Sequence, residues 1–427
     1  MAISACAMFA FSAPLFPDAN RYAKTLIGAL TLTALARGER DRELFPLFVF
    51  FLISLGLEVT SWLASFQAAQ FHFMPDSLPR IEGVGKWFWF LLLAFWLRKK
   101  PWAPGLFWTF AALALVVTPW ILGDGVKEIE RALAGYRIDA GTRNAQHAAM
   151  YAGVALIGGI CLIIDGSTRS DKRVLFICAG TALTTTALFY LYGTQTRAIW
   201  LGSLFAIAVI LVSFSLLTPT LADRRIKKKY IIMTVSLVVL VGMLAAMQTP
   251  MSSKIERETG TVSLALQGKF SEIPLDSSGV RIRSWYYALP WIAQSPVFGW
   301  GPDGSKLIMQ ESDAIPAPLK SRFGHLHNTY MDLLAQYGVA GLAFYLGLLA
   351  WLATRLIQAH KNNAISPSVF LFGTGFLAYW LVINIFESYM FYDSGKYAFS
   401  AVLAGTLSLT LKPRQSATAQ EFRQEYA

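Results

Sequence analysis

Apolar residues in this sequence are gathered in long runs separated by short polar stretches. About twelve runs can be drawn, at roughly 1–17, 21–36, 44–64, 83–98, 102–122, 146–165, 174–193, 198–219, 230–248, 329–354, 367–387 and 395–411. A helix needs about 20 apolar residues to cross the hydrocarbon core of a bilayer. The pattern therefore predicts an all-α polytopic membrane protein with about 12 transmembrane helices. The first run lacks a positively charged start, which favours a span over a signal peptide.

Lys and Arg are concentrated in one set of loops, and we expect these loops to face the cytoplasm. Their cations are Arg37, Arg40, Arg42, Arg98, Lys99, Lys100, Arg169, Lys172, Arg173, Arg224, Arg225, Lys227, Lys228, Lys229, Arg355, Lys361, Lys412, Arg414 and Arg423. Both termini are then cytoplasmic. The predicted organisation is nine spans in 1–248, an external loop subdomain with short helices in 249–328, three spans in 329–411 and a cytoplasmic tail in 412–427.

Composition supports the membrane class. The chain is 55% hydrophobic and 15% charged, whereas soluble domains are about 45–50% apolar and about 25% charged. The net charge of +11 does not indicate a nucleic-acid protein, because Lys and Arg occur in short clusters between apolar runs. The three cysteines lie inside or beside apolar runs, so no disulfide framework is implied.

The external face also carries many cations, eight of them in 249–328 and four in 123–145. Long loops are exempt from the positive-inside rule, so ordinary loop charge explains these counts. The alternative is an anionic ligand such as a phosphate. Arg197 is more specific, since it follows Thr194-Gln195-Thr196 between two apolar runs with almost no loop. An arginine so close to two membrane-spanning runs either has a function or is paired with another group, or else its charged end snorkels to the membrane interface.

The stretch from Ser277 to Trp285, continuing to Pro290, is expected to form an amphipathic helix at the membrane surface. Arg281 and Trp285 then share a face at i, i+4. The helix serves either as an interfacial anchor or as a clamp for a diphosphate. Gly299-Trp300-Gly301-Pro302-Asp303-Gly304 matches G-x-G-x-x-G, but no βαβ unit surrounds it, so we interpret it as a turn.

The segment His325-Leu326-His327-Asn328-Thr329-Tyr330 stands directly before the tenth apolar run. We expect a helix N-terminus there, which favours anions. A neutral His327, with a ring nitrogen facing external water, can accept a proton from a hydroxyl near neutral pH. Two other roles stay open. The His-x-His pair could bind a metal, although no third ligand is evident, and Asn328 or Thr329 could only cap the helix.

These motifs resemble the O-antigen ligase and Wzy C-terminal superfamily of bacterial envelope glycosyltransferases. The family has a His-Asn pair, nine residues and Gly-x-x-Gly, and this sequence has His327-Asn328 followed by Gly338 and Gly341. Upstream, the family has an Arg four residues before a Trp, then a Pro and a Gly-x-Gly. The matching positions here are Arg281, Trp285, Pro296 and Gly299-Trp300-Gly301, and a second family Arg matches Arg197.

The resemblance implies a GT-C-like fold that transfers a glycan from undecaprenyl diphosphate at the periplasmic face of the bacterial inner membrane. In the ligase the acceptor is a sugar hydroxyl of lipid A–core, and the reaction inverts the anomeric centre without nucleotide, metal or other cofactor. Arg281 and Arg197 would bind the diphosphate, and His327 would deprotonate or orient the acceptor hydroxyl. Further residues implied at the site are Arg283, His325, Asn328 and Tyr330. The implied partners are lipid-linked O-antigen, lipid A–core and membrane lipids, with no nucleic acid.

O-antigen ligase is the leading interpretation. An O-antigen polymerase would have the same fold and donor but a glycan acceptor, and a protein O-oligosaccharyltransferase is disfavoured by the short tail after the last run. A lipid or polysaccharide transporter would place its polar site near the bilayer midplane, whereas these motifs stand at the outer ends of the runs. A channel or structural protein would leave the His-Asn motif unexplained.

Overall fold

The structure is a computed structural model that describes residues 1–39, 42–71, 73, 78–79, 83–168, 171–217 and 251–411. It is 78% helix, and these residues contain no strand. The expected all-α fold is therefore confirmed.

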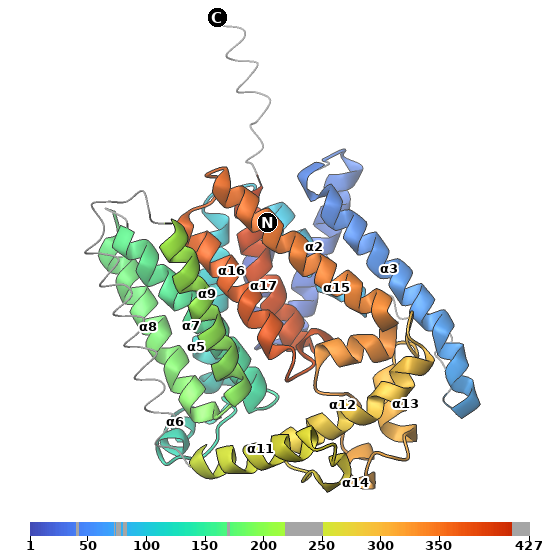
Figure 1. The fold of residues 1–427 in the computed structure, drawn as a ribbon. Coiled ribbons are helices and arrows are strands. Elements are labelled where there is room, and N and C mark those ends of the chain that lie inside the picture. The colour runs from blue at the N-terminus through green and yellow to red at the C-terminus, as the bar shows by residue number, and fades with distance from the viewer. Residues whose placement is uncertain are drawn as a thin grey trace, which may run out of the picture.

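The apolar runs form the long helices of a bundle (Figure 1). These are α1 (Ala2–Ser12), α2 (Pro17–Ala36), α3 (Phe45–Ser65), η3 (Val84–Phe88) leading into α4 (Trp89–Leu97), α5 (Ala103–Ile121), α7 (Ala145–Thr168), α8 (Arg173–Thr194), α9 (Arg197–Leu217), α15 (Thr329–Lys361), α16 (Pro367–Ile383) and α17 (Asp393–Thr410). Each coincides with an expected run, and the expected run at 230–248 lies outside the described residues.

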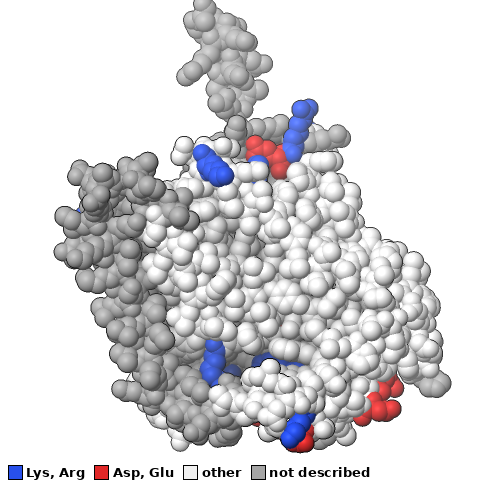
Figure 2. All heavy atoms as spheres, in the orientation of Figure 1, with Lys and Arg blue, Asp and Glu red and all other residues white. Residues whose placement is uncertain are grey.

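Six helices in the described residues are long and apolar enough to cross a membrane, and three further apolar helices, Ala2–Ser12, Val84–Leu97 and Pro367–Ile383, are shorter. Figure 2 shows charged side chains near two opposite ends of one face, with a broad uncharged band between them. Such a band suits a hydrocarbon environment, in which ionised groups are costly. The protein is thus a polytopic membrane protein by its helices and surface, and the total of twelve spans stays a prediction.

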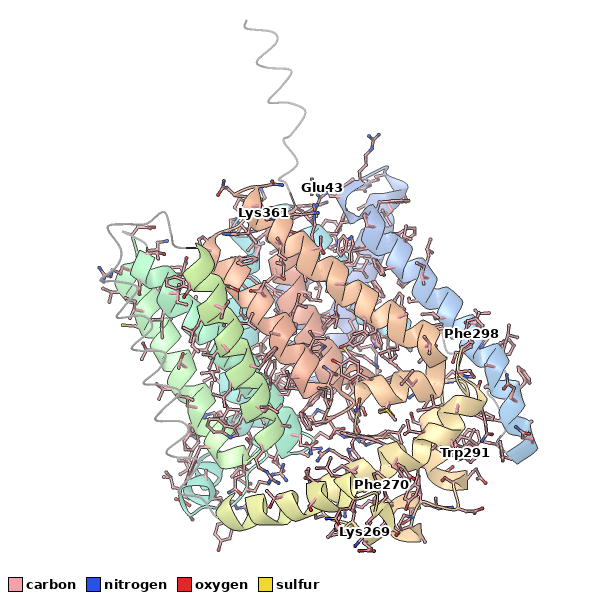
Figure 3. All side chains as sticks on the ribbon, viewed as in Figure 1. Glu43, Lys269, Phe270, Trp291, Phe298 and Lys361 are labelled. Atoms are coloured by element: carbon pink, nitrogen blue, oxygen red, sulfur yellow. The ribbon has the colours of Figure 1, made fainter. Side chains whose placement is uncertain are left out.

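Loops expected in the cytoplasm meet at one end of the bundle. Lys99 Nζ lies 2.6 Å from Glu39 Oε2, and Arg355 Nη2 lies 3.1 Å from Glu43 Oε2, which belongs to the short helix η1 (Arg42–Leu44). Figure 3 places Glu43 and Lys361 at this end and Lys269 and Trp291 at the other. The grouping agrees with the expected topology, whereas the side of the membrane stays a prediction. Arg40, Arg169, the loop 224–229 and the tail 412–427 lie outside the described residues.

The long segment before α15 is folded, as expected, and lies across the end opposite to Glu43 (Figures 1 and 3). Its helices are α11 (Met251–Leu266), η5 (Phe270–Glu272), α12 (Ser277–Gln294), α13 (Gly304–Glu311) and α14 (Ala317–Lys320). They enclose a small apolar core separate from that of the bundle, which includes Ile292, Trp300, Leu307 and Leu326. The same end also carries η2 (Phe66–Phe71), α6 (Val126–Leu133) and η6 (Tyr389–Phe391). The proposed domain limits of 249 and 328 stay predictions.

The expectation of one continuous span over 329–354 is wrong at Gly338. This residue has a φ of 63° and non-helical geometry, so α15 consists of a short helix before Gly338 and a long one after it. A Cβ at Gly338 would come within 2.3 Å of the Val297 backbone, and one at Gly299 (φ 69°) within 2.5 Å of the Gln336 backbone. The two glycine motifs therefore interlock, with Trp300 N donating to Ala335 O. The turn expected at Gly299-Trp300-Gly301 is confirmed.

Candidate functional site

Arg281 is positioned by the start of α12. Asp276 caps this helix, since its side chain accepts hydrogen bonds from the backbone of Ser278 and Gly279. One turn on, Arg281 Nη1 donates to Ser277 O at 2.8 Å and Arg281 Nε donates to Phe386 O at 2.8 Å. The guanidinium thus ties α12 to the connection between α16 and α17, and its orientation is fixed before any ligand binds.

Arg197 stands at the start of α9, directly after a tight turn from α8. Gln195 has a φ of 49°, which ends α8 and turns the chain at once into α9. Arg137, from the loop after α6, holds this turn. Its Nε donates to Thr194 O at 2.9 Å and its Nη2 donates to Thr196 Oγ1 at 3.3 Å. In the sequence, Arg137 is one of the four cations in 123–145 and carries no sign of this role.

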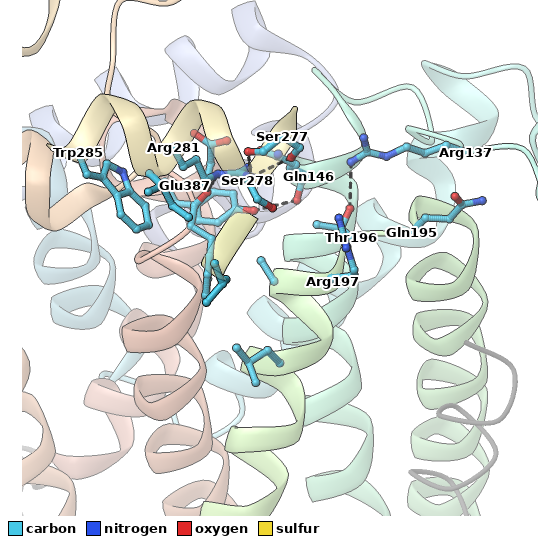
Figure 4. A pocket seen from close by; sticks show the side chains of 16 residues that line it. Arg137, Gln146, Gln195, Thr196, Arg197, Ser277, Ser278, Arg281, Trp285 and Glu387 are labelled. Atoms are coloured by element: carbon cyan, nitrogen blue, oxygen red, sulfur yellow. Dashed lines mark hydrogen bonds between the residues drawn. The ribbon is translucent and has the colours of Figure 1, made fainter. Parts of the chain in front are cut away.

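These arginines line one pocket of about 560 Å³ at the end of the bundle that α12 covers (Figure 4). Its polar lining residues come from α7, α9, α12, the loop after α6, the turn between α8 and α9, and the α16–α17 connection. The pocket is lined by Arg137, Gln146, Gln195, Thr196, Arg197, Ala198, Leu201, Val262, Ser277, Ser278, Arg281, Ile282, Trp285, Phe386, Glu387 and Tyr389. Arg281 and Trp285 share it, as their i, i+4 spacing predicted.

The pocket is electrostatically suited to an anion. Three guanidinium groups face it, and Glu387 is the one carboxylate in its described lining. Partial burial and the positive charges of Arg281 and Arg197 lower the pKa of Arg137, and the interaction with Tyr389 opposes this effect. A bound diphosphate would relieve the mutual repulsion of the arginines and accept hydrogen bonds from their planar forks.

His327 lies at the entrance to α15, beside the pocket. Asn328 caps α15 and accepts hydrogen bonds from Tyr330 N at 2.9 Å and Met331 N at 3.2 Å. The capping role considered for Asn328 is therefore confirmed. His327 has a φ of 51° in the left-handed region, which is costly for a residue with a side chain. Trp285 Nε1 donates to Leu326 O at 2.8 Å and so joins the histidine loop to α12.

Glu387 is the partner of His327 and was not identified from the sequence. Both of its carboxylate oxygens lie 3.3 Å from His327 Nδ1. Burial alone would raise the pKa of the Glu387 carboxyl, but its contacts with His327, His325 and Ser388 N lower it to about 2. The ionised carboxylate favours a proton on Nδ1 and leaves Nε2 as the hydrogen-bond acceptor.

The expected exposure of His327 is corrected by the structure. Only 13% of its side chain is exposed. Nε2 is buried and has no hydrogen-bond partner among the described residues. A substrate hydroxyl that gives its proton to Nε2 would therefore have to enter the protein, because the ring is not exposed to solvent.

Gln146 links the two halves of the site. With its amide oriented to satisfy both neighbours, its oxygen accepts from Arg281 Nη2 at 2.9 Å and its nitrogen donates to Glu387. Glu387 thus belongs to the arginine pocket and contacts His327 at the same time.

His325 has a different environment from His327. Its Nε2 lies 2.7 Å from Tyr392 Oη, and its Nδ1 accepts from His327 N at 3.2 Å. Burial and the neighbouring His327 lower the pKa of His325 to about 4. Its ring is thus neutral near pH 7, and its two nitrogens have partners in Tyr392 and in the backbone of His327.

The structure adds Glu387 as a third candidate metal ligand beside the His-x-His pair, which the sequence did not show. Ligand atoms of His325, His327 and Glu387 lie within 4.8 Å of one another, close enough to hold a cation. The same spacing also fits hydrogen bonding, since His327 Nδ1 and His325 Nδ1 lie 3.3 Å and 3.7 Å from the carboxylate. Independence from metal stays a prediction.

Two other expected site residues lie elsewhere. Arg283 Nη1 donates to Ile273 O at 3.1 Å, and Arg283 does not line the pocket although it is two residues from Arg281. Tyr330 Oη donates to Leu381 O at 2.6 Å and braces the start of α15 against the end of α16. Both side chains have structural contacts, and their roles toward substrate stay predictions.

The residues missed from sequence come from other parts of the chain. Glu387 is a carboxylate at the end of an apolar run, and an ionisable group in such a position is a signal of function. Gln146 and Arg137 have no comparable signal, because the loop 123–145 and the start of α7 reach the site only through tertiary packing.

Residues 182–346 match a family model, Wzy_C, described as "O-Antigen ligase". The matched segment contains Arg197, Arg281 and His327 but ends before Glu387. The chain is also similar to a Haemophilus influenzae protein with the printed name "Uncharacterized protein", at 23% identity over 235 residues. That alignment covers 53% of this chain and 55% of the Haemophilus protein, so the chain spans about half the length of this relative.

Proposed function

We propose that the protein is an O-antigen ligase, on the premise that its residues 182–346 match the O-antigen ligase family model. The family comprises enzymes of glycosyl transfer, as ligases or polymerases. In our proposal the protein transfers O-antigen polysaccharide from undecaprenyl diphosphate to a sugar hydroxyl of lipid A–core. The reaction takes place at the periplasmic face of the bacterial inner membrane, with inversion and without metal.

The observation that carries the proposal is that Arg137, Arg197 and Arg281 line one pocket whose single described carboxylate, Glu387, contacts His327. The reaction requires groups that stabilise the diphosphate as it leaves and a group that accepts the proton of the attacking hydroxyl. The arginines supply fixed donors for the charge that develops on the diphosphate. His327 supplies the base, oriented by Glu387.

In the proposed step, the acceptor oxygen attacks the anomeric carbon from the side opposite to the diphosphate. The new carbon–oxygen bond forms as the bond to the diphosphate breaks, and the hydroxyl proton passes to Nε2 of His327. Undecaprenyl diphosphate leaves with its negative charge held by Arg197 and Arg281. The apolar pocket residues Leu201, Val262 and Ile282 provide a surface for the first isoprene units of the carrier.

The test is reconstitution of the purified protein in liposomes with lipid-linked O-antigen and lipid A–core, in the presence of EDTA and without nucleotide. Formation of ligated lipopolysaccharide is the expected result. Extension of the lipid-linked glycan without transfer to lipid A–core would identify a polymerase instead. Loss of activity in EDTA that Mg²⁺ or Mn²⁺ restores would assign a metal to the His325–His327–Glu387 group.

A further inference from the structure

The side chains of His325, His327 and Glu387, which we call the His–His–Glu group, have the composition of a transition-metal site. They offer two imidazole nitrogens and one carboxylate oxygen, and these ligand atoms lie within 4.8 Å of one another. Two imidazoles and one carboxylate form a known ligand set of Zn²⁺ sites that leave a fourth position open. Mg²⁺ and Ca²⁺ prefer oxygen ligands. The composition of the group therefore favours Zn²⁺ over these two cations.

The distances within the His–His–Glu group suit a tetrahedral ion. Ligand atoms that lie about 2.0–2.2 Å from Zn²⁺ in a tetrahedron lie about 3.3–3.6 Å from one another. His327 Nδ1 lies 3.3 Å from Glu387 Oε2, and His325 Nδ1 lies 3.7 Å from Glu387 Oε1. Small side-chain movements therefore suffice to bring the three ligand atoms onto one ion.

Two of the three ligands are oriented by further hydrogen bonds, as the ligands of metal sites usually are. His325 Nδ1 accepts from His327 N at 3.2 Å, which assigns the ring proton to Nε2. His325 Nε2 then donates to Tyr392 Oη at 2.7 Å. Glu387 Oε1 accepts from Ser388 N at 3.0 Å. These contacts fix the orientation of the carboxylate and hold His325 in the tautomer that binds a metal through Nδ1.

Exposure and charge suit the His–His–Glu group to reversible binding. The side chain of His325 is 25% exposed, whereas that of Glu387 is 4% exposed. An ion can therefore reach the group from solvent at His325. The positive charges of Arg281 and Arg143 act on His325 and weaken the attraction of the group for a cation. We therefore expect Zn²⁺ to bind more weakly here than in a structural zinc site and to dissociate readily.

We propose that the His–His–Glu group binds Zn²⁺ and that the bound ion inhibits glycosyl transfer. The inference rests on the proposed function, because it concerns the base of the proposed step. When Zn²⁺ occupies Nδ1 of His327, the single proton of the neutral ring resides on Nε2. Nε2 then cannot accept the proton of the attacking hydroxyl, and Glu387 binds the ion in place of the ring. The arginines of the pocket keep their contacts with the donor, so Zn²⁺ blocks transfer and not donor binding.

The binding test uses the full-length protein in nanodiscs, stripped with EDTA, and measures Zn²⁺ binding by competition with a chromogenic chelator. Tyr392→Phe removes the partner of His325 and should weaken binding by about 10–100-fold, and Glu387→Gln, which removes a ligand, by more. The control is His360→Asn, which removes one imidazole near the last turn of α15, at the opposite end of the bundle (Figure 3). It should bind as the wild type does. Equal Zn²⁺ affinity in all four proteins would place the ion elsewhere and overturn the proposal.

The inhibition test titrates Zn²⁺ into the ligation assay, with each protein compared to its own rate in EDTA. Wild-type ligation should fall with a midpoint equal to the measured Kd, recover in excess EDTA and be insensitive to Mg²⁺. For Tyr392→Phe the midpoint should rise by the same factor as its Kd. Zn²⁺ that captured the donor diphosphate would instead inhibit both proteins at the same concentration. That result, or binding without inhibition, would overturn the proposal.

The two tests together separate this inference from the proposed function. If the wild type does not ligate but binds Zn²⁺ in a manner that depends on Glu387 and Tyr392, the ligase assignment fails and the metal site stands. If it ligates in EDTA and neither binds Zn²⁺ nor is inhibited by it, the metal site fails and the ligase assignment stands. Activation of the EDTA-treated enzyme by Zn²⁺ would overturn the inhibitory role.

Discussion

The two ends of the bundle both carry Lys and Arg, but they use them differently. At the end of α15 and η1, two described cations lie in ion pairs, Lys99 with Glu39 and Arg355 with Glu43. At the opposite end, Arg137, Arg197 and Arg281 line one pocket with Glu387 as its single described carboxylate. Surface ion pairs contribute little to stability, whereas cations that converge on one pocket favour binding of an anion there. Charge arrangement, and not charge count, therefore distinguishes the end with the proposed site from the opposite end.

The largest effect is expected at His327. His327→Ala should reduce ligation by about 10²–10⁴-fold, the usual contribution of a general base, and should leave donor binding largely intact. Ligation rates, donor binding and thermal stability measured on one purified preparation test this. A stable variant that ligates at the wild-type rate would eliminate the base role. A destabilised variant that has lost donor binding would favour a structural role for the loop.

Next comes the arginine pocket. Arg281→Ala and Arg197→Ala should each lower turnover by about 10²–10³-fold, as when one donor to a developing negative charge is removed, and should weaken donor binding. Arg→Lys should also be damaging, because a point charge cannot replace a bidentate fork. Arg283→Ala is the matched control on the same helix and should retain activity. Equal losses for Arg281→Ala and Arg283→Ala would show that α12 acts only as a scaffold.

A smaller effect is expected from Glu387→Gln, which keeps the shape but removes the charge beside His327. The rate should fall on the order of tenfold, since a charge-assisted hydrogen bond becomes a neutral one. With a folded-state pKa of about 2, the stability contributed by Glu387 is present above the unfolded pKa and is lost as pH falls through about 2. The Tm difference between wild type and Glu387→Gln should therefore be constant above about pH 5. A difference that changes between pH 6 and 8 would contradict an ionised carboxylate.

A pH effect on stability is expected at His325, whose pKa is lowered to about 4. The unfolded chain binds a proton at this residue near pH 6.5, whereas the folded protein binds it only near pH 4. Folded-state stability should therefore fall as pH drops from about 6.5 to about 4. Thermal unfolding of the wild type and of His325→Asn at a series of pH values measures this. Parallel curves for the two proteins would show that His325 does not cause the fall.

The smallest effects are expected at the opposite end. Lys99→Ala and Arg355→Ala should each change the free energy of unfolding by at most about 1 kcal/mol, the usual range for exposed ion pairs, and should leave ligation at the wild-type rate. Unfolding and ligation assays measure both quantities. A strong loss of ligation in either variant would mean that the two ends of the bundle are coupled.

Sequence patterns indicated those residues of the candidate site that match a motif, namely Arg197, Arg281, Trp285 and His327. The structure brings these residues to one end of the bundle. Glu387 was missed because it faces His327 only after the α16–α17 connection folds back beside α15. Arg283 was expected at the site, but it lies two residues from Arg281, and a two-residue step turns a helical side chain to another face.

The sequence by itself determined that the chain is all-helical and that its apolar runs form the long helices of a bundle. It also determined that the polar motifs collect at one end. These properties follow from local composition, because a segment in hydrocarbon has to satisfy its backbone within one helix. Only the tertiary structure decided that three arginines share one pocket, that α15 breaks at Gly338, and that His327 is buried against Glu387. These features depend on side chains from distant segments meeting within hydrogen-bonding distance, which the packing of the helices determines and which no local pattern of residues encodes.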